Sequence, residues 1–231
     1  MVDRSALAPL SLAEIVADHD GRGVRVLLVD TGVAPLETIG ERLHKSWIVN
    51  PSSDTFRVQR EPATPTDRLG HGTAVASVLT AHAPGAGLES LAAIGPDARA
   101  PSLRIVQALE WGIEAGFDII NCSFSTGLVE YLASYKRVVD LAFVRGVLIV
   151  SGCSNRDYRA VSYPGSFSSV LSTDYADLPG LTVRRRRGQL VEFVARGVNV
   201  PCRWRDGRTV RMTGSSVAAP HLCALVARLR Q

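Results

Sequence analysis

Four short, nearly continuous apolar runs rich in β-branched residues constrain the fold of this chain most strongly. They are Val24–Asp30 ("VRVLLVD"), Phe117–Phe124, Gly146–Gly152 and Ser168–Asp174. Runs of this length and composition are typical of strands that are buried on both faces of a parallel sheet. A further strand is expected around Ser90–Ile94.

Segments with helical periodicity lie between these runs, at His71–His82, Pro101–Ala115, Leu128–Arg145 and Val217–Arg230. The alternation predicts an α/β fold, with a doubly wound, mostly parallel sheet and helices on both faces. Ligand sites in such sheets lie at the carboxyl ends of the strands. The least regular region, His44–Gly70, is rich in Pro, Ser and Asp, and we expect it to be an extended surface connection.

The length and composition favour one globular domain. The chain has 231 residues, 46% of them hydrophobic, so we expect a single domain over residues 1–231 with an N-terminal extension at 1–22. No apolar run approaches the ~18 residues of a membrane span, so no membrane partner is expected. The N-terminal stretch lacks the basic and then apolar pattern of a secretory signal, which predicts a cytoplasmic location.

The cysteines and the charge are also informative. Cys122, Cys153, Cys202 and Cys223 are scattered without CxxC spacing, so we expect small buried thiols in a reducing compartment, with no bound metal and no cofactor. Much of the net charge of +4 comes from Arg184–Arg187. We expect a solvated turn there; the alternatives are a dock for an acidic partner or a protease-sensitive loop. No aromatic residue interleaves with these arginines, so no nucleic-acid partner is expected.

Three polar motifs stand at the boundaries of the expected elements. Asp30 ends an apolar strand, His71 opens a helix, and Ser215 and Ser216 precede the last helix in "GSSVAAPH". Each has a plain structural alternative: a turn cap for Asp30, an exposed helix-start histidine for His71, and a helix N-cap for Ser215. Together they supply an acid, a base and an alcohol, and a hydroxyl becomes a useful nucleophile only when an oriented base takes its proton.

In sequence, "VLLVDTGV", "GHGTAVAS" and "GSSVAAPH" resemble the aspartate, histidine and serine motifs of the subtilisin-like serine proteases. The resemblance runs from Val24 to the end of the chain. It implies that Ser216 is the nucleophile, that His71 is its base and that Asp30 orients His71. Ser215 then takes the place of the family's threonine.

The resemblance extends to oxyanion and substrate contacts. "GVLIVSGCSNRD" places Asn155 where the family has its oxyanion asparagine, and "DIINCSFST" resembles the family's substrate-binding strand. Ser125 and Thr126 stand where the family usually has two glycines, which predicts a groove that is narrower or different in polarity. The residues expected to contact substrate are Ser123, Phe124, Ser125, Thr126, Ser151, Gly152, Cys153 and Gly165.

The expected activity is that of a serine endopeptidase that acts on peptides or proteins through an acyl-enzyme, with the narrow specificity of a processing protease. A peptide cyclase or ligase that uses the same acyl-enzyme is one alternative, and a non-catalytic pseudoprotease scaffold is another. The family's calcium loops have no residue-by-residue match, so calcium binding is not carried over from the resemblance. The short C-terminal end allows a partner protein to complete the fold.

Overall fold

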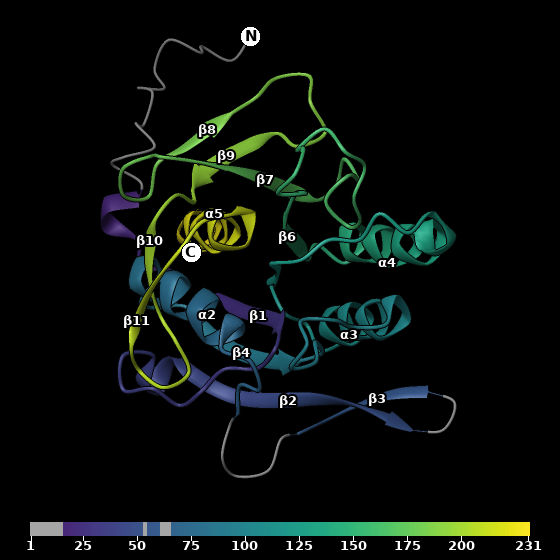
Figure 1. Ribbon diagram of the computed structural model, residues 1–231, viewed down its shortest axis with the longest axis horizontal. Coiled ribbons are helices and arrows are strands. Elements are labelled where there is room, and N and C mark those ends of the chain that lie inside the picture. The colour runs from purple at the N-terminus through teal and green to yellow at the C-terminus, as the bar shows by residue number, and fades with distance from the viewer. Residues whose placement is uncertain (1–15, 53–54, 61–65) are drawn as a thin grey trace, which may run out of the picture.

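A single large sheet organises the protein, seen in a computed structural model that describes residues 16–52, 55–60 and 66–231 (Figure 1). The first 15 residues, most of the expected N-terminal extension, lie outside this range. Within the described part of the chain the sheet has nine strands, in the order β3-β2-β4-β1-β5-β6-β7-β9-β8. The strands are β1 (Arg25–Asp30), β2 (Leu43–Ser52), β3 (Thr55–Arg60), β4 (Gly87–Ala92), β5 (Ile119–Cys122), β6 (Leu148–Gly152), β7 (Leu171–Ala176), β8 (Val183–Arg185) and β9 (Phe193–Arg196). Six adjacent pairs from β2 to β9 are parallel, and the edge strands β3 and β8 are antiparallel to their neighbours.

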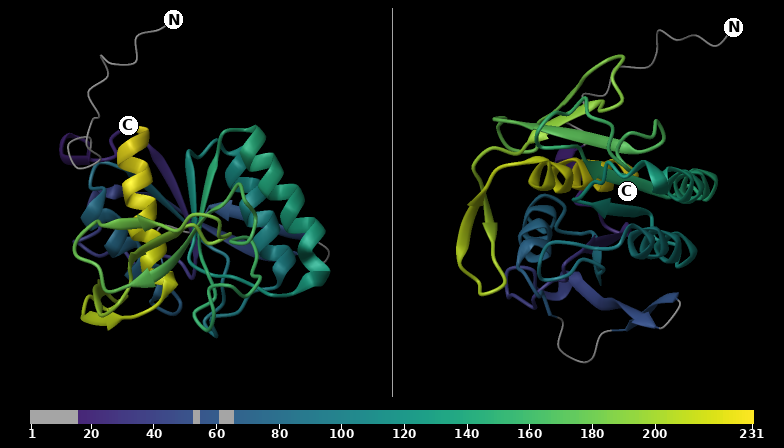
Figure 2. Two further views of the ribbon diagram at one scale, coloured as in Figure 1. Left: turned by 90° about the horizontal axis from the view of Figure 1, so that it is seen from above. Right: turned by 45° about the vertical axis from the view of Figure 1, so that its right-hand side comes forward.

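Helices cover both faces of the sheet, as Figures 1 and 2 show. One face carries α2 (His71–His82) and α5 (Ser215–Arg230), and the other carries α3 (Ser102–Glu114) and α4 (Leu132–Val144). Strand β1 shows why two layers of helix are needed. Leu27 and Val29 belong to the core on the α3–α4 side, whereas Val26 and Leu28 belong to the core on the α2–α5 side. The predicted doubly wound α/β fold is confirmed.

The expected elements match the structure closely, apart from shifted ends. The four apolar runs form β1, β5, β6 and β7, and the strand expected around Ser90–Ile94 is β4. The helix expected from Leu128 begins as a single 3-10 turn, η3 (Val129–Tyr131), before α4 starts.

The interpretation of His44–Gly70 as a surface connection was wrong for its first half. Strand β2 pairs in parallel with β4, and β3 then returns antiparallel to β2. Ile48 and Val49 are buried, and the indole of Trp47 donates a hydrogen bond to Glu89 of β4 at 2.7 Å. These apolar residues are too few, and too mixed with polar ones, for the run to be recognised without its sheet partner.

A separate hairpin of β10 (Val200–Arg203) and β11 (Thr209–Met212) lies beside α2 (Figure 1). Its backbone is tied to the helix because the Arg203 N–H donates to the Ser77 hydroxyl at 2.9 Å. At its turn Trp204 lies against Gly70, just before α2. A Cβ added to Gly70 would come within 2.2 Å of the indole, so only glycine fits there.

The carboxyl ends of the central strands define where chemistry can occur. β1 ends at Asp30, β5 at Cys122 and β6 at Gly152, and these three parallel strands are neighbours in the sheet. His71 opens α2, the helix that covers β1. Residues that follow the three strands therefore lie near helix starts at the carboxyl end of the sheet, as expected for this class of sheet.

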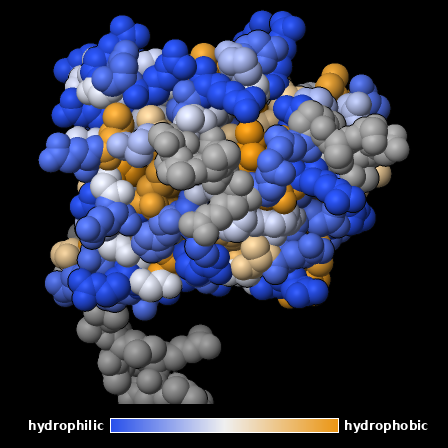
Figure 3. All heavy atoms as spheres, turned by 90° about the horizontal axis from the view of Figure 1, so that it is seen from below, coloured by the Kyte–Doolittle hydropathy of each residue, from blue (hydrophilic) through white to orange (hydrophobic). Residues whose placement is uncertain are grey.

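The surface and the cysteines agree with a globular chain. On the face shown in Figure 3, hydrophilic side chains predominate and hydrophobic ones appear in small groups. Among the described residues, no helix is long and apolar enough to cross a membrane. All four cysteines are free and buried, as predicted. Burial raises the pKa of Cys202 to about 11.

A buried histidine joins the two helices on the α2–α5 face. His221 is 1% exposed, its Nδ1–H donates to the carbonyl of Val217 at 2.8 Å, and its ring lies 4.8 Å from that of His82. The pKa of His221 is lowered to about 4, chiefly by burial and also by the nearby His82 and Arg196, against the effect of the bond to Val217. The pKa of His82 is lowered too, chiefly by burial.

Acid should therefore destabilise the fold through His221. Because its pKa is lower in the folded than in the unfolded chain, the unfolded chain takes up the proton first as pH falls. The contribution of neutral His221 to the free energy of unfolding is fully present above about pH 6.5 and is lost as pH falls towards 4. The total loss is on the order of 3 kcal/mol. Urea unfolding at pH 7.5, 6, 5 and 4.5 measures this loss. His221→Gln should flatten the pH dependence, whereas His44→Gln, at an exposed site, should leave it unchanged. Equal slopes in all three proteins would contradict the assignment to His221.

Candidate active site

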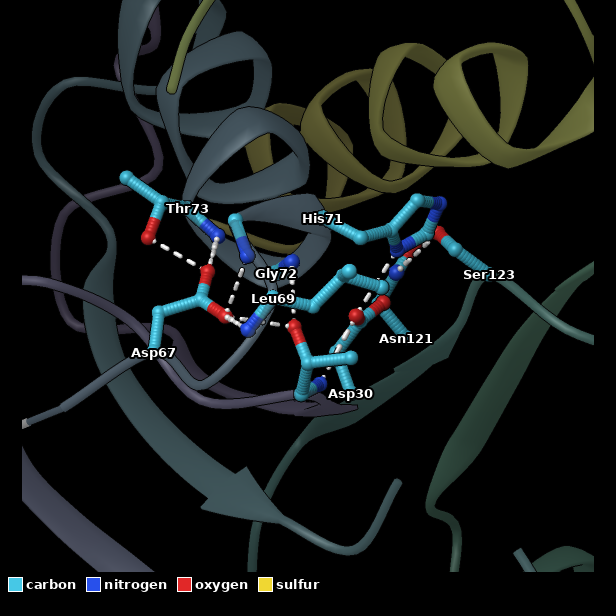
Figure 4. A network of polar contacts seen from close by, with 10 residues as sticks. Asp30, Asp67, Leu69, His71, Gly72, Thr73, Asn121 and Ser123 are labelled. Carbon is cyan, nitrogen blue, oxygen red and sulfur yellow. Dashed lines mark hydrogen bonds and ion pairs between the residues drawn. The ribbon is translucent and has the colours of Figure 1, made fainter. Parts of the chain in front are cut away.

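A buried carboxylate and a histidine form the centre of the site. Asp30, the last residue of β1, is 0% exposed, and its Oδ1 accepts a hydrogen bond from Nδ1 of His71 at 2.7 Å (Figure 4). The same oxygen accepts the Thr31 N–H at 2.8 Å. The side chain of His71 is 21% exposed. The ring is therefore held through Nδ1, which leaves Nε2 as its second functional atom.

The charge of Asp30 raises the pKa of His71 above its ordinary value. Burial opposes this effect, while the hydrogen bond to Asp30 and the more distant charge of Asp67 add to it. Asp30 thus stabilises the imidazolium form. Only the neutral ring can accept a proton, so general-base chemistry requires a pH above this raised pKa.

The two adjacent serines at the start of α5 have different environments. Ser215 is 3% exposed, and its hydroxyl donates to the carbonyl of Cys153 at 2.7 Å. Ser216 is partly exposed, and within the described residues its hydroxyl makes no hydrogen bond. The next residue, Val217, packs in one cluster with Ala74 and Val78 of α2, so the beginnings of the two helices are neighbours. Ser216 therefore carries the uncommitted hydroxyl.

Asn155 is tied to the same helix start. Its Oδ1 accepts the Ser215 N–H at 2.8 Å, which orients the carboxamide and leaves Nδ2 as a donor. Gly214, with φ +149, lies directly against it, since an added Cβ would come within 3.1 Å of Asn155 Oδ1. The side chain of Asn155 itself is exposed. An exposed amide donor held at this helix start is a group that could stabilise an oxyanion.

The residues expected to contact substrate converge from three segments. Ser151 Oγ lies 3.4 Å from the carbonyl oxygen of Phe124, and a Cβ added to Gly165 would lie 3.4 Å from the carbonyl oxygen of Gly152. Thr126 exchanges two backbone hydrogen bonds with Tyr163, at 3.0 and 2.7 Å. The structure thus brings these segments together, and their contact with substrate stays a prediction.

Ser123 and Cys153 are more deeply engaged. Ser123 Oγ accepts a hydrogen bond from Asn121 Nδ2 at 3.0 Å (Figure 4). The N–H of Cys153 donates to Thr173, its carbonyl accepts from Ser215, and its thiol lies 3.6 Å from Asp174 Oδ1. Both backbone groups of Cys153 are therefore already hydrogen-bonded within the protein.

A cavity of about 290 Å³ opens beside the segment that follows β5. Phe124, Ser125 and Thr126 form one wall. The remaining lining is mainly apolar, with Ile94, Ala98, Arg99, Ala100, Ser102, Ile105, Leu128 and Tyr135. A bulky apolar side chain fits a cavity of this size and lining.

The model of the subtilase family matches residues 21–231. The chain belongs to the subtilase family. Membership makes it a serine protease, in agreement with the resemblance found in its motifs.

Known proteases resemble this subtilase over most of its length. Subtilisin BL of Lederbergia lenta is 28% identical over 221 residues, which cover 91% of this chain and 77% of that protein. M-protease of Shouchella clausii (strain KSM-K16) is also 28% identical over 221 residues, which cover 91% of this chain but 55% of M-protease. This subtilase thus spans about half the length of M-protease.

Solved structures show the same fold. A cold adapted subtilisin-like serine proteinase superposes with a TM-score of 0.71 at 21% identity, covering 91% of this subtilase and 76% of that chain. A second structure, named S41 psychrophilic protease, superposes with a TM-score of 0.74 at 21% identity. The match covers 91% of this subtilase and 77% of that chain.

Sequence reasoning missed Asp67, which links the segments that carry Asp30 and His71 in this subtilase (Figure 4). This buried carboxylate accepts five hydrogen bonds: from the Thr31 hydroxyl, from the N–H groups of Leu69 and Gly70, and from both the N–H and the hydroxyl of Thr73. It therefore joins the residue after Asp30 to the first turn of the helix that carries His71. An acid shortly before a helix start is the signal that could have revealed it.

Asp67→Asn should destabilise this subtilase by about 2–4 kcal/mol, because an amide has one acceptor oxygen and turns N–H groups towards N–H groups. Urea unfolding at pH 7.5 measures the loss. Asp206→Asn is the matched control: Asp206 is exposed and accepts one backbone hydrogen bond, from Arg208 at 3.1 Å, and its loss should cost less than about 0.5 kcal/mol. A decrease of less than about 1 kcal/mol in the free energy of unfolding for Asp67→Asn would show that the Asp67 network contributes little to stability.

Among the described residues, no group of three or more His, Cys, Asp or Glu side chains is arranged to hold a metal ion.

Proposed function

We propose that this subtilase is an endopeptidase whose nucleophile is Ser216, with His71 as general base and Asp30 as its orienting acid. The observation that carries the proposal is the 2.7 Å contact of Asp30 with His71. It lies at the end of the sheet where α5 begins, and Ser216 in the first turn of α5 carries an uncommitted hydroxyl. The exposed part of the His71 ring supports access to substrate.

The reaction follows from these groups. The oxygen of Ser216 attacks the peptide carbonyl while His71 Nε2 takes its proton, and Asp30 stabilises the resulting imidazolium. The oxygen of the tetrahedral intermediate accepts hydrogen bonds from Asn155 Nδ2 and from the Ser216 N–H, which lies in the first turn of α5 where backbone donors lack helical partners. His71 then donates its proton to the leaving amine, and an acyl-enzyme remains. Water, deprotonated by His71, releases the acid and restores Ser216.

Replacing each serine in turn tests the choice of nucleophile. Ser216→Ala should abolish labelling by a fluorophosphonate probe and should leave the unfolding midpoint unchanged. Ser215→Ala should keep labelling within about tenfold of wild type and should destabilise the fold by about 1 kcal/mol, because the buried carbonyl of Cys153 loses its donor. Labelling rates measured by mass spectrometry, with urea unfolding alongside, separate the two effects. Labelling that survives in Ser216→Ala and disappears in Ser215→Ala would move the nucleophile to Ser215.

We further propose narrow specificity, as in a protease that processes few substrates. Ser125 and Thr126 place side chains on the wall of the 290 Å³ cavity beside the predicted substrate strand. An extended peptide that pairs with this strand would present alternate side chains to the cavity. The apolar lining favours a bulky apolar residue on the acyl side of the cut.

Replacing Ser125 and Thr126 together with glycine should broaden the range of cleaved peptides, because two side chains leave the groove. Mass analysis of a diverse peptide library after incubation with each protein gives the cleavage profile. Leu190→Ala, an exposed apolar position that does not line this cavity, serves as the control and should match wild type. An unchanged profile in the glycine variant would contradict the assigned role. Joined peptides in the same library would indicate ligation, and a protein that neither cleaves nor labels would indicate a scaffold.

The predicted setting and partner remain proposals. Four buried free thiols are compatible with a reducing compartment such as the cytoplasm. At the C-terminal end, Gln231 Oε1 accepts hydrogen bonds from the N–H groups of Asp20, Gly21 and Arg22, so this end is already held by the chain itself. A partner there would have to bind over this contact.

A further inference from the structure

The arginine run at 184–187 does not behave as a uniformly solvated turn. Arg186 points inward: its side chain is 30% exposed, and its Nη2 donates to Asp174 Oδ2 at 2.7 Å. Asp174 lies on β7 with a side chain that is 13% exposed. Arg184 and Arg187 are exposed, as expected of the whole run. The expectation of a solvated turn is thus wrong for Arg186, which is partly buried, and for Arg184 and Arg185, which belong to strand β8.

Arg186 also contacts the segment that carries Asn155. The carbon of its guanidinium lies 4.0 Å from the centroid of the Tyr158 ring. Its own backbone is fixed, since the Arg186 N–H donates to the carbonyl of Glu192 at 2.5 Å. A guanidinium stacked on an aromatic face and paired with a carboxylate is a rigid contact that restrains both partners. Tyr158 is therefore tied to β7 through one side chain.

Asp174 holds the other end of that segment. Cys153 lies next to Asp174, with its thiol 3.6 Å from Oδ1, and the Cys153 N–H donates to the carbonyl of Thr173 at 3.0 Å. Cys153 and Tyr158 thus flank residues 154–157. Arg186 contacts Tyr158 directly, and it contacts Asp174, which in turn lies against Cys153. Asn155, Arg156 and Asp157 between them are exposed and have few contacts of their own.

We propose that Arg186 is a positioning residue for Asn155: by clamping Asp174 and Tyr158 it holds the 153–158 segment so that the Asn155 amide faces the oxyanion. The inference rests on the proposed function, in which Asn155 donates to the oxyanion. The Asn155 side chain has one further restraint, the bond from Ser215 N–H to its Oδ1. That bond sets the rotation of the amide, and the clamp sets where the backbone beneath it lies. The open hollow of about 330 Å³ bounded by Ser154, Asn155, Tyr158 and Asp174 provides no packing that could replace the clamp.

Arginine suits this role in a way that lysine does not. The planar guanidinium can lie flat on the Tyr158 ring while an N–H at its edge donates to Asp174. A lysine ammonium could reach only one of the two partners well. Arg186→Lys should therefore recover part, and not all, of the effect of Arg186.

A double-mutant cycle with Asn155 tests the proposal. The measured quantity is the second-order rate of fluorophosphonate labelling, because the phosphoryl oxygen of the probe takes the place of the oxyanion. Asn155→Ala should slow labelling by about 100-fold or more, and Arg186→Met by about 10-fold. In the Asn155→Ala background Arg186→Met should cause no further slowing, because the group that it positions is gone. A merely structural role would slow labelling equally in both backgrounds.

Controls and alternative outcomes complete the test. Arg184→Met and Arg187→Met, at exposed positions of the same run, should label as wild type does. If Arg186→Met is unfolded by circular dichroism, Arg186→Lys takes its place in the cycle. A tenfold effect that is the same with and without Asn155, or no effect of Arg186 substitutions at all, overturns this inference and leaves the proposed function standing. Wild-type protein that labels no faster than Ser216→Ala overturns both.

Discussion

The burial of the Asp30 carboxylate is the constraint on which the rest of the site depends. A carboxylate with no exposed surface is costly unless hydrogen bonds and a nearby positive charge compensate for lost hydration. Thr31 N–H supplies one bond and His71 supplies the other, together with a charge when it is protonated. The same interaction with Asp30 raises the pKa of His71. The fold therefore places an imidazole at this point of the sheet and also prepares it to hold a proton.

Placing the imidazole is a task for the backbone that leads into α2. Asp67 takes the N–H groups before and within the first turn of this helix and the hydroxyl of Thr31, so the end of β1 and the start of α2 cannot move independently. Gly72 allows the two segments to approach, because a Cβ there would lie 2.1 Å from the Gly32 carbonyl oxygen. The two buried carboxylates thus have different roles. Asp30 acts on the ring, and Asp67 acts on the backbone that carries it.

The parts of this architecture that could be predicted from sequence are those in which local pattern and final environment agree. Val24–Asp30 is apolar on both sides, and β1 is buried on both sides; His71 and Ser216 stand at helix starts that their own neighbours specify. The strand β2 escaped prediction because its parallel partner, β4, lies across the connection through α2, and Trp47 and Glu89 meet only in the folded sheet. Asp67 and Arg186 escaped for a related reason. Each reads as a surface charge in a polar stretch, and its partners are identified only by the tertiary fold.

The two serines at the start of α5 show how one helix start can supply both an anchor and the proposed nucleophile. Neighbouring residues on a helix point about 100° apart, so when one faces the sheet the next cannot. Ser215 faces the end of β6, where Cys153 accepts its hydroxyl and Asn155 accepts its N–H, and this fixes the helix start against the segment that carries Asn155. Ser216 is then turned away from these partners and stays partly exposed. The hydroxyl of Ser216 is free because that of Ser215 is committed. The same commitment ties the Asn155 amide to the helix that carries Ser216, so a direct contact helps to orient the proposed amide donor relative to the proposed nucleophile.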